Sequence, residues 1–275
     1  MIDYGADLFK GTAWYYAMYR PLYPASLVRY IVDKFSLDGE GRLLDLGCGT
    51  GQLSLRFQDW FEDIVGIDPE PEMLEEARRL SIDNRVDNVQ WLQGKAEERV
   101  HYLGKFRLIT IAKAFHWLDR ETILELLYHH TDVDGGIAII GNDSEKHEPL
   151  PWQLMVNEVV ARWLGSERRA GNRTYQPPTE RYEDTLTKSR YRNIENHVLP
   201  TYSHTWTVDS IVGNLYSTSY GAKRFFGEDL ERFEDELRTA LLAINPADQF
   251  LEEHSVSVIT GMRHATRLTN SRMLI

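Results

Sequence analysis

The chain has 275 residues, enough to bury a sizeable core as one large domain or as one domain with an insertion. Hydrophobic residues make up 42% of it and charged residues 27%, as is usual for a globular protein. Its formal net charge of −11, from 31 basic and 42 acidic residues, disfavours nucleic acid as the main partner and leaves room only for a local basic patch.

The cysteine content and the N-terminal residues further restrict the kinds of protein that this sequence can encode. Cys48 is the single cysteine, which excludes an internal disulfide and argues against a cysteine-based metal site. The opening MIDYGADLFKG lacks a basic stretch followed by an apolar one, so it does not predict a secretory signal. No apolar run is long enough to span a bilayer. We therefore expect a soluble, cytoplasmic protein with no membrane partner and no bound metal.

Strands and helices alternate through the first half of the chain. Short apolar strands are expected at residues 42–48, 63–69, 89–94, 106–115 and 135–143. Helices are expected around them, at residues 24–37, 50–61, 69–81 and 119–130. Alternation at this spacing is typical of a parallel sheet with helices on both faces.

The alternation breaks after residue 143. A helix is expected at 149–165 and a loop at 166–184, so residues 144–195 are interpreted as an insertion or cap. Beyond it, strands are expected at 195–207 and 254–262, with helices at 208–219 and 227–244 between them. Residues 264–275 are expected to form a tail.

Three glycines, Gly47, Gly49 and Gly51, crowd between the first strand and the next predicted helix. Glycine tolerates positive φ and has no Cβ, so a ligand can lie against bare backbone there. The helix N-terminus adds unpaired N–H groups and a partial positive charge. Asp45 precedes this turn inside an apolar strand, where an unpaired carboxylate would be costly to bury.

The second strand ends in Asp68, where open α/β sheets bind the hydroxyls of a ribose. The alternative is an exposed loop aspartate. The glycines have the spacing G-x-G-x-G, whereas a dinucleotide site needs G-x-G-x-x-G. We therefore expect a nucleoside shorter than a dinucleotide, with its other end over the glycine turn.

The stretches DLGCGTGQ and GIDPEPEML resemble the class I S-adenosylmethionine-dependent methyltransferases, and within them the branch that acts on small molecules. YYAMYRPLYP, QGKAEE, AKAFHWLD and YSHTWTVDSIVGNLYSTSY agree with this, so the resemblance covers residues 12–143 well and 196–263 moderately. It implies a Rossmann-like, doubly wound α/β fold with a mostly parallel seven-stranded sheet, an antiparallel last strand and a helical cap. The cofactor-binding domain would comprise residues 1–143 and 196–263.

The resemblance also implies a cofactor, S-adenosylmethionine, with S-adenosylhomocysteine as the product. Its methionine portion would lie on the glycine turn, its ribose on the acid after the second strand, and its carboxylate on a guanidinium, which suits a bidentate grip. The implied cofactor-binding residues are Tyr16, Arg20, Asp45, Gly47, Cys48, Gly49, Gln52, Asp68, Pro69, Met73, Ala96, Glu97, Ala112 and Lys113. For Glu97, a surface position in the charged run KAEER is an equal alternative.

Four aromatic residues are expected on the acceptor side of the transferring methyl group: Tyr19, Phe115, His116 and Trp117. Aromatic walls suit a cationic sulfonium. His116 could accept a proton from a hydroxyl or amine acceptor, which makes it the candidate catalytic residue. The alternative is that it only packs against or orients its loop.

Residues 162–192 carry eight Lys or Arg against four Asp or Glu. They are compatible with a pocket for an anionic or polar aromatic substrate, with contact to RNA, or with a solvated surface. The leading hypothesis is methyl transfer to oxygen or nitrogen of a small molecule. The alternatives are an RNA or protein methyltransferase, an NAD-binding oxidoreductase and a nucleoside-binding protein without catalytic activity.

Overall fold

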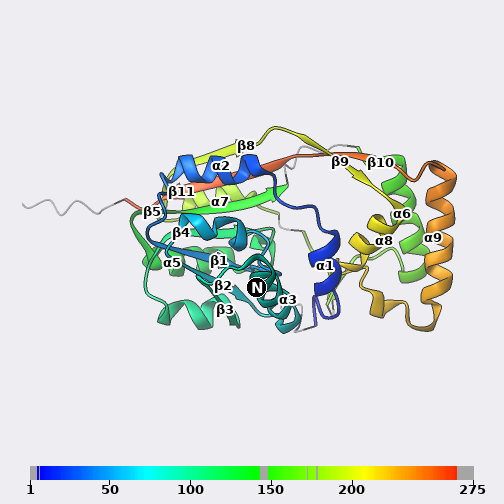
Figure 1. Ribbon diagram of the computed structural model, residues 1–275, viewed down its shortest axis with the longest axis horizontal. Helices are drawn as coiled ribbons and strands as arrows, with labels where there is room; N and C mark the ends of the chain where they lie inside the picture. The colour runs from blue at the N-terminus through cyan, green and yellow to red at the C-terminus, as the bar shows by residue number, and fades with distance from the viewer. Residues whose placement is uncertain (1–4, 6, 143–147, 172, 178, 265–275) are drawn as a thin grey trace, which may run out of the picture.

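The computed structural model describes residues 5, 7–142, 148–171, 173–177 and 179–264. Its main sheet has seven strands in the order β3-β2-β1-β4-β5-β11-β8 (Figure 1). Neighbours among the first five strands pair in parallel, and β11 runs antiparallel to both β5 and β8. The predicted α/β fold with an antiparallel last strand is confirmed. The strands are β1 (Arg42–Leu46), β2 (Asp63–Asp68), β3 (Val89–Gln93), β4 (Phe106–Ala112), β5 (Thr131–Asn142), β8 (Arg192–Val198) and β11 (Val256–Met262).

Alternate residues of the central strands face two separate apolar layers, as the two-residue period of a strand requires. Leu43 and Ile64 pack on the side of α2 (Ala25–Lys34) and the 3-10 helix η1 (Ser54–Trp60), and α3 (Pro71–Asn84) covers Trp91 of β3. Leu44 and Val65 pack on the opposite side. The elements of that side are α4 (Ala96–Arg99), η2 (Val100–Tyr102), α5 (Arg120–His130) and α7 (Tyr182–Lys188).

The helix predicted at 50–61 is shorter and tighter than expected. Gly51 has φ +75°, which keeps it outside a right-handed helix, so only η1 forms after the glycine turn. Phe57 and Phe61 still reach the core on that side of the sheet. The sequence therefore predicted a helical segment at this place correctly, although its type and length were wrong.

Three helices form a lobe with a core of its own at one end of the sheet (Figure 1). They are α6 (Pro151–Leu164), α8 (Val208–Tyr216) and α9 (Leu230–Ile244). The lobe therefore draws on residues 208–244 as well as 151–164, whereas the sequence assigned only 144–195 to a cap. The reason is packing: the apolar faces of α8 and α9 bury Val212, Phe233 and Leu237 against α6 instead of against the sheet. By contrast, α7, in the predicted cap, packs on the sheet through Leu186.

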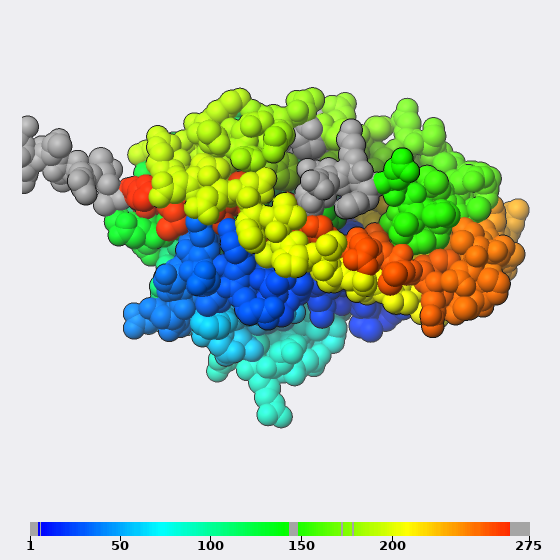
Figure 2. Space-filling model, turned by 90° about the horizontal axis from the view of Figure 1, so that it is seen from above, coloured from blue at the N-terminus to red at the C-terminus, as the bar shows by residue number. Residues whose placement is uncertain are grey.

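A two-stranded ribbon connects the lobe to the sheet. The strand predicted at 195–207 divides into β8 and β9 (Tyr202–Trp206) around Pro200, which has no N–H to donate to a ladder. β9 pairs with β10 (Phe250–His254), a strand that the sequence did not predict. Figure 2 shows this ribbon running between the two parts of the molecule.

Smaller elements complete the described structure. α1 (Ala13–Tyr19) contacts both α8 of the lobe and α3 of the sheet domain. The remaining elements are η3 (Phe115–Trp117), β6 (Arg169–Ala170), β7 (Arg173–Thr174), η4 (Lys223–Phe225) and η5 (Gly227–Asp229). Across the described residues, no helix is both long and apolar enough to cross a membrane. Except for His264, the predicted tail lies outside the described residues.

Candidate active site

A cavity of about 400 Å³ lies where β1, β2 and β4 end, at the carboxyl edge of the sheet. Ligands of open α/β sheets bind at this edge. Most of the predicted cofactor-binding residues line it: Tyr16, Gly47, Gly49, Asp68, Pro69, Met73, Ala96, Glu97, Ala112 and Lys113. The structure thus brings together in one cavity residues that are far apart along the chain.

The three glycines of the turn all have positive φ, but they serve different purposes. A Cβ at Gly47 would lie 2.5 Å from Ala114 Cβ, and one at Gly51 would lie 2.5 Å from Trp91 Cη2. These two glycines therefore allow close packing of the protein on itself. A Cβ at Gly49 would meet only Tyr16 Cε1 at 3.9 Å, so Gly49 exposes backbone that a ligand can approach.

Asp68 joins the turn to the second strand. Its two oxygens accept hydrogen bonds from the backbone N–H groups of Gly49 and Glu70, each at 2.9 Å. The side chain is 9% exposed, and burial raises its pKa to about 6 in spite of those bonds. Each carboxylate oxygen has a further lone pair for a donor such as a ribose hydroxyl.

Besides Arg20, three of the predicted cofactor-binding residues do not line this cavity: Asp45, Cys48 and Gln52. Asp45 is 1% exposed and accepts hydrogen bonds from Ser54 Oγ at 2.6 Å and Thr110 Oγ1 at 2.8 Å, while burial raises its pKa. It supports the strand beneath the turn and does not line the cavity, although the resemblance implied a cofactor-binding residue there. The Cys48 side chain is buried against α3, and Gln52 Nε2 donates to Tyr16 O at 3.4 Å, tying the turn to α1.

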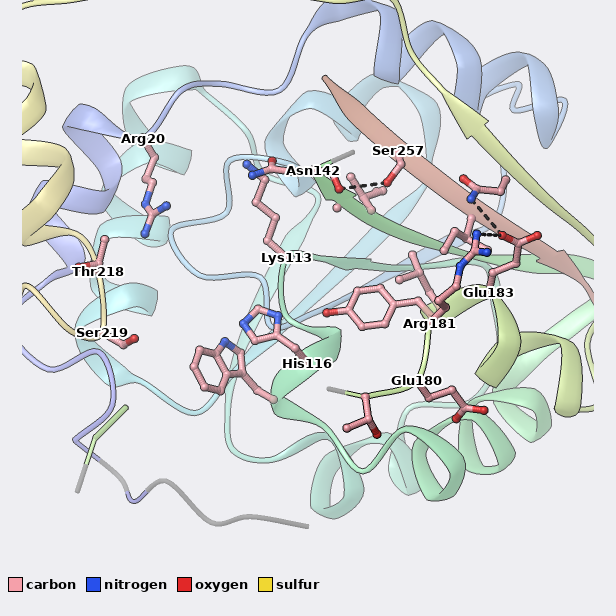
Figure 3. A pocket seen from close by; sticks show the side chains of 18 of the residues that line it. Arg20, Lys113, His116, Asn142, Glu180, Arg181, Glu183, Thr218, Ser219 and Ser257 are labelled. Atoms are coloured by element: carbon pink, nitrogen blue, oxygen red, sulfur yellow. Dashed lines mark hydrogen bonds and ion pairs between the residues drawn. The ribbon is translucent and has the colours of Figure 1, made fainter. Parts of the chain in front are cut away.

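A second cavity, of about 550 Å³, lies between the ends of β4 and β5 and the helical lobe. It shares Phe9, Tyr16, Lys113 and Trp117 with the first cavity, so the two adjoin. Figure 3 shows side chains reaching it from several directions. Its polar lining residues are Tyr16, Arg20, Lys113, His116, Trp117, Asn142, Arg168, Thr179, Glu180, Arg181, Tyr182, Glu183, Asn196, Thr218, Ser219 and Ser257.

Lys113 stands at the junction of the two cavities. It has φ +55°, uncommon for a residue with a side chain, and its backbone N–H donates to Ile140 O at 2.8 Å. Burial, together with the nearby Arg20, lowers the pKa of its ammonium to about 8. Glu252 acts in the opposite direction on this pKa, less strongly than burial and Arg20, and within the described residues it forms no ion pair with Lys113. The sequence predicted only a backbone contact here.

Arg20 reaches the second cavity from the loop after α1. Its guanidinium lies 5.0 Å from the centre of the Tyr16 ring, and its Nη2 donates to Ser217 O at 3.4 Å. Its Nε is buried and has no hydrogen-bond partner within the described part of the chain. A buried donor without a partner is costly, so a carboxylate of a ligand would fit there.

Two of the residues predicted on the acceptor side, His116 and Trp117, line the second cavity. The centres of their rings lie 4.3 Å apart. Burial, with Arg168 and Arg120 nearby, lowers the pKa of His116 to about 4. The imidazole is therefore neutral near pH 7 and weakly basic.

Two predicted residues of the acceptor side lie elsewhere, and both placements correct the prediction. Phe115 is 1% exposed and belongs to the core beneath η3, with its ring edge-on to Tyr182 at 5.1 Å. Tyr19 packs between α1 and α8, so close that a Cβ on Gly213 would lie 2.3 Å from its Cδ2. Consecutive aromatics in a turn point in different directions, and the sequence alone did not show which ones face the cavity.

The N-terminal segment, residues 7–11, contributes a wall that the sequence did not predict. Phe9 lines both cavities, and its ring lies 6.0 Å from that of Trp117. Gly11 N donates to Glu72 Oε2 of α3 at 2.6 Å, and Arg224 of the lobe donates to the carbonyls of Asp7 and Lys10. The segment thus links the sheet domain to the lobe over the site.

Within the described residues, four of the eight basic residues of the stretch 162–192 form ion pairs with acids, Lys188 with Glu180 among them. Arg162 pairs with Glu158 and Glu236, Arg181 with Glu183, and Arg190 with Glu125. Such pairs reduce the positive field that contact with RNA would need. Arg168 differs, because it lines the second cavity and its guanidinium lies 4.9 Å from the ring centre of Tyr175 and 4.5 Å from that of Tyr220.

Comparison with known proteins connects this geometry to a family. Residues 43–135 match the family model of a methyltransferase domain. The chain is 27% identical over 156 residues to an uncharacterized methyltransferase-like protein of Schizosaccharomyces pombe, covering 56% of this chain and 58% of that protein. It is 30% identical over 130 residues to the probable S-adenosylmethionine-dependent methyltransferase CRG1 of Saccharomyces cerevisiae, covering 45% and 43%. The aligned part therefore spans about half the length of these curated relatives.

Solved structures show the same fold over nearly the whole chain. A putative type II methyltransferase from Anaeromyxobacter dehalogenans aligns with a TM-score of 0.55 at 23% identity, covering 89% of this chain and 96% of that one. An S-adenosylmethionine-dependent methyltransferase from Geobacter sulfurreducens, in complex with S-adenosyl-L-homocysteine, aligns with a TM-score of 0.52 at 18% identity, covering 94% and 98%. Similarity at this level of identity supports the fold alone.

Proposed function

Because this chain carries a class I, S-adenosylmethionine-dependent methyltransferase domain, we propose that it transfers a methyl group from S-adenosylmethionine to oxygen or nitrogen of a small-molecule acceptor. The observation that carries the proposal is the pair of adjoining cavities. One follows the glycine turn and Asp68, the other opens toward the lobe, and the two share Lys113 and Trp117. A donor in the first and an acceptor in the second would meet at this shared wall.

The residues of the first cavity fit the cofactor. Gly49 exposes bare backbone and Asp68 has free lone pairs for the ribose. Arg20, which lines the adjoining second cavity, has a buried donor for the carboxylate at the far end of the cofactor. Pro69, Met73 and Ala96 supply apolar surface beside Asp68 that suits an adenine ring. When bound, the cofactor would supply an electrophilic methyl group on a sulfonium, and its transfer to a lone pair of the acceptor would break the carbon–sulfur bond and leave the thioether S-adenosylhomocysteine.

Positioning is the main task left to the protein, since the displacement needs three atoms in line. Trp117 and Phe9 limit the access of water at the junction and offer aromatic faces to a positive charge. His116, neutral near pH 7, would accept a hydrogen bond from a hydroxyl or amine of the acceptor and so orient its lone pair. With a pKa of about 4, it would be a poor general base for an acceptor that must lose its proton first.

Calorimetry with S-adenosylhomocysteine and with NAD tests the cofactor, and a screen for release of S-adenosylhomocysteine from S-adenosylmethionine tests the reaction. We expect binding of S-adenosylhomocysteine, no comparable binding of NAD, and release in the presence of a small-molecule fraction. Tighter binding of NAD, or no release with any small-molecule fraction, would contradict the proposal.

A further inference from the structure

The second cavity has an excess of positive charge that the cofactor would not neutralise. Its lining contains four cations, Arg20, Lys113, Arg168 and Arg181, against two acids, Glu180 and Glu183. This local excess occurs in a chain whose formal net charge is −11. A concentration of one sign of charge in a cleft attracts ligands of the opposite sign.

Both acids of this lining already have partners. Glu183 Oε2 accepts hydrogen bonds from Arg181 Nη2 and Asn196 Nδ2, each at 3.1 Å. Glu180 pairs with Lys188 and accepts a hydrogen bond from Thr185 Oγ1 at 3.1 Å. Arg20, Lys113 and Arg168 therefore remain as three cations for which the described residues offer no ion pair with a carboxylate.

Cofactor binding would use only part of this charge. If Arg20 holds the carboxylate of S-adenosylmethionine, as proposed above, Lys113 and Arg168 are left. The cofactor has a carboxylate, an ammonium and a sulfonium, so it adds one more positive charge at the junction of the cavities. Cations packed together in a partly buried site are unfavourable unless a counter-charge joins them.

We infer that the acceptor carries an anionic group, a carboxylate or a phosphate, which Lys113 and Arg168 bind in the second cavity that His116 also lines; the inference rests on the proposed function. Lys113 is at the end of β4, three residues before His116, and Arg168 is near enough to His116 to affect its charge. Arg168 is held by stacking on Tyr175 and Tyr220, which fixes its plane for a bidentate contact. Figure 3 shows Lys113 and His116 on one wall of the cavity and Arg20 with Ser219 on another.

A fractionated small-molecule extract tests the inference. The extract is separated at neutral pH on an anion-exchange column, and each fraction is assayed with S-adenosylmethionine for release of S-adenosylhomocysteine. We expect the active acceptor in the retained, anionic fraction. Treatment of that fraction with alkaline phosphatase separates the two chemistries: lost activity indicates a phosphate monoester and unchanged activity a carboxylate.

Variants locate the anion contact in the structure. Arg168→Gln should weaken binding of the purified acceptor to protein saturated with S-adenosylhomocysteine by about tenfold, measured by calorimetry, because one charge-assisted contact is lost. Lys113→Gln should weaken it at least as much. Arg173→Gln is the matched control, because this nearby exposed cation lies outside the cavity lining. In each variant the affinity for S-adenosylhomocysteine reports whether the fold and the first cavity are intact.

The outcomes separate the two proposals. Activity found only in the unretained fraction, or acceptor binding unchanged in both Arg168→Gln and Lys113→Gln, would overturn the anionic acceptor and leave the methyltransferase proposal standing. No binding of S-adenosylhomocysteine and no release with any fraction would overturn the proposed function itself.

Discussion

The two cavities of the site are built in different ways. On the side of the glycine turn, the Asp68 carboxylate accepts hydrogen bonds from the backbone N–H groups of Gly49 and Glu70, at the ends of two neighbouring strands. The lobe side is assembled from segments far apart in the chain, among them Arg20, Lys113, Arg168 and Ser219. Under the proposed function, this difference means that exposed backbone shapes much of the cofactor site, whereas side chains from distant segments recognise the acceptor.

The strongest test of this contrast is Gly49→Val. The variant places a branched side chain in the first cavity at φ +53°, so we expect a loss of S-adenosylhomocysteine affinity of more than about 100-fold, with only about 1–2 kcal/mol of stability lost to backbone strain. Calorimetry and urea unfolding measure the two effects. Gly165→Ala is the control: its φ is +88° with open space around a Cβ, and it should show strain without any loss of affinity. Retained affinity in Gly49→Val would show that the ligand does not lie on this backbone.

Asp68 is the next largest expected effect. Asp68→Ala should weaken binding of S-adenosylhomocysteine by about 1–3 kcal/mol, because hydrogen bonds to a buried charged group are lost. In the unliganded protein the carboxyl has a pKa of about 6, raised by burial, so it becomes protonated as the pH falls through 6 and then accepts hydroxyl donors less well. We expect wild-type affinity to fall between pH 7.5 and pH 5, and that slope to vanish in Asp68→Ala. An identical slope in both proteins would assign the titration to another group.

His116 should show a smaller effect. Because its pKa is about 4, we expect His116→Gln to lower kcat by about tenfold or less, below the range of a true general base, and to leave the pH profile between 5 and 8 unchanged. Steady-state kinetics across that range measure both quantities. A loss of more than 100-fold, with an inflection near neutral pH that disappears in the variant, would show that the imidazole removes a proton.

The smallest effect is expected on the paired basic surface. Arg190→Gln removes an exposed partner of Glu125 and should change the free energy of unfolding by about 0.5 kcal/mol or less. It should leave the affinities for cofactor and acceptor unchanged. Measurable RNA binding by the wild type that is lost in Arg190→Gln would instead give this surface the role that its pairing argues against.

The same contrast explains how much of the molecule could be predicted from its sequence. The positions of the seven main strands and of most helices follow from apolar patterns, and the glycine turn follows from spacing, because these signals are local. The lobe could not be delimited in this way, since α8 and α9 have apolar faces that fit a sheet as well as another helix. The pairing of β9 with β10 depends on contacts between residues more than forty positions apart, such as Trp206 and Phe250.

Within the site, the sequence did not predict the direction in which each side chain points. Asp45 has hydrogen-bond partners, as a buried carboxylate requires. These partners are the hydroxyl groups of Ser54 and Thr110, which belong to the protein itself. In the run Phe115, His116, Trp117, a turn of 3-10 helix sends the first ring to the core and the other two to the cavities. Arg168 and Phe9 lie in stretches without a recognisable motif, and only the folded chain brings them to the site.

The N-terminal segment has a consequence for how the two ligands affect each other. Residues 7–11 are anchored at Glu72 and Arg224, and Phe9 between these anchors borders both cavities. Any displacement of the N-terminal segment therefore changes the shape of both cavities at once. Under the proposed function, we therefore expect entry of one substrate and departure of the other product to be kinetically coupled.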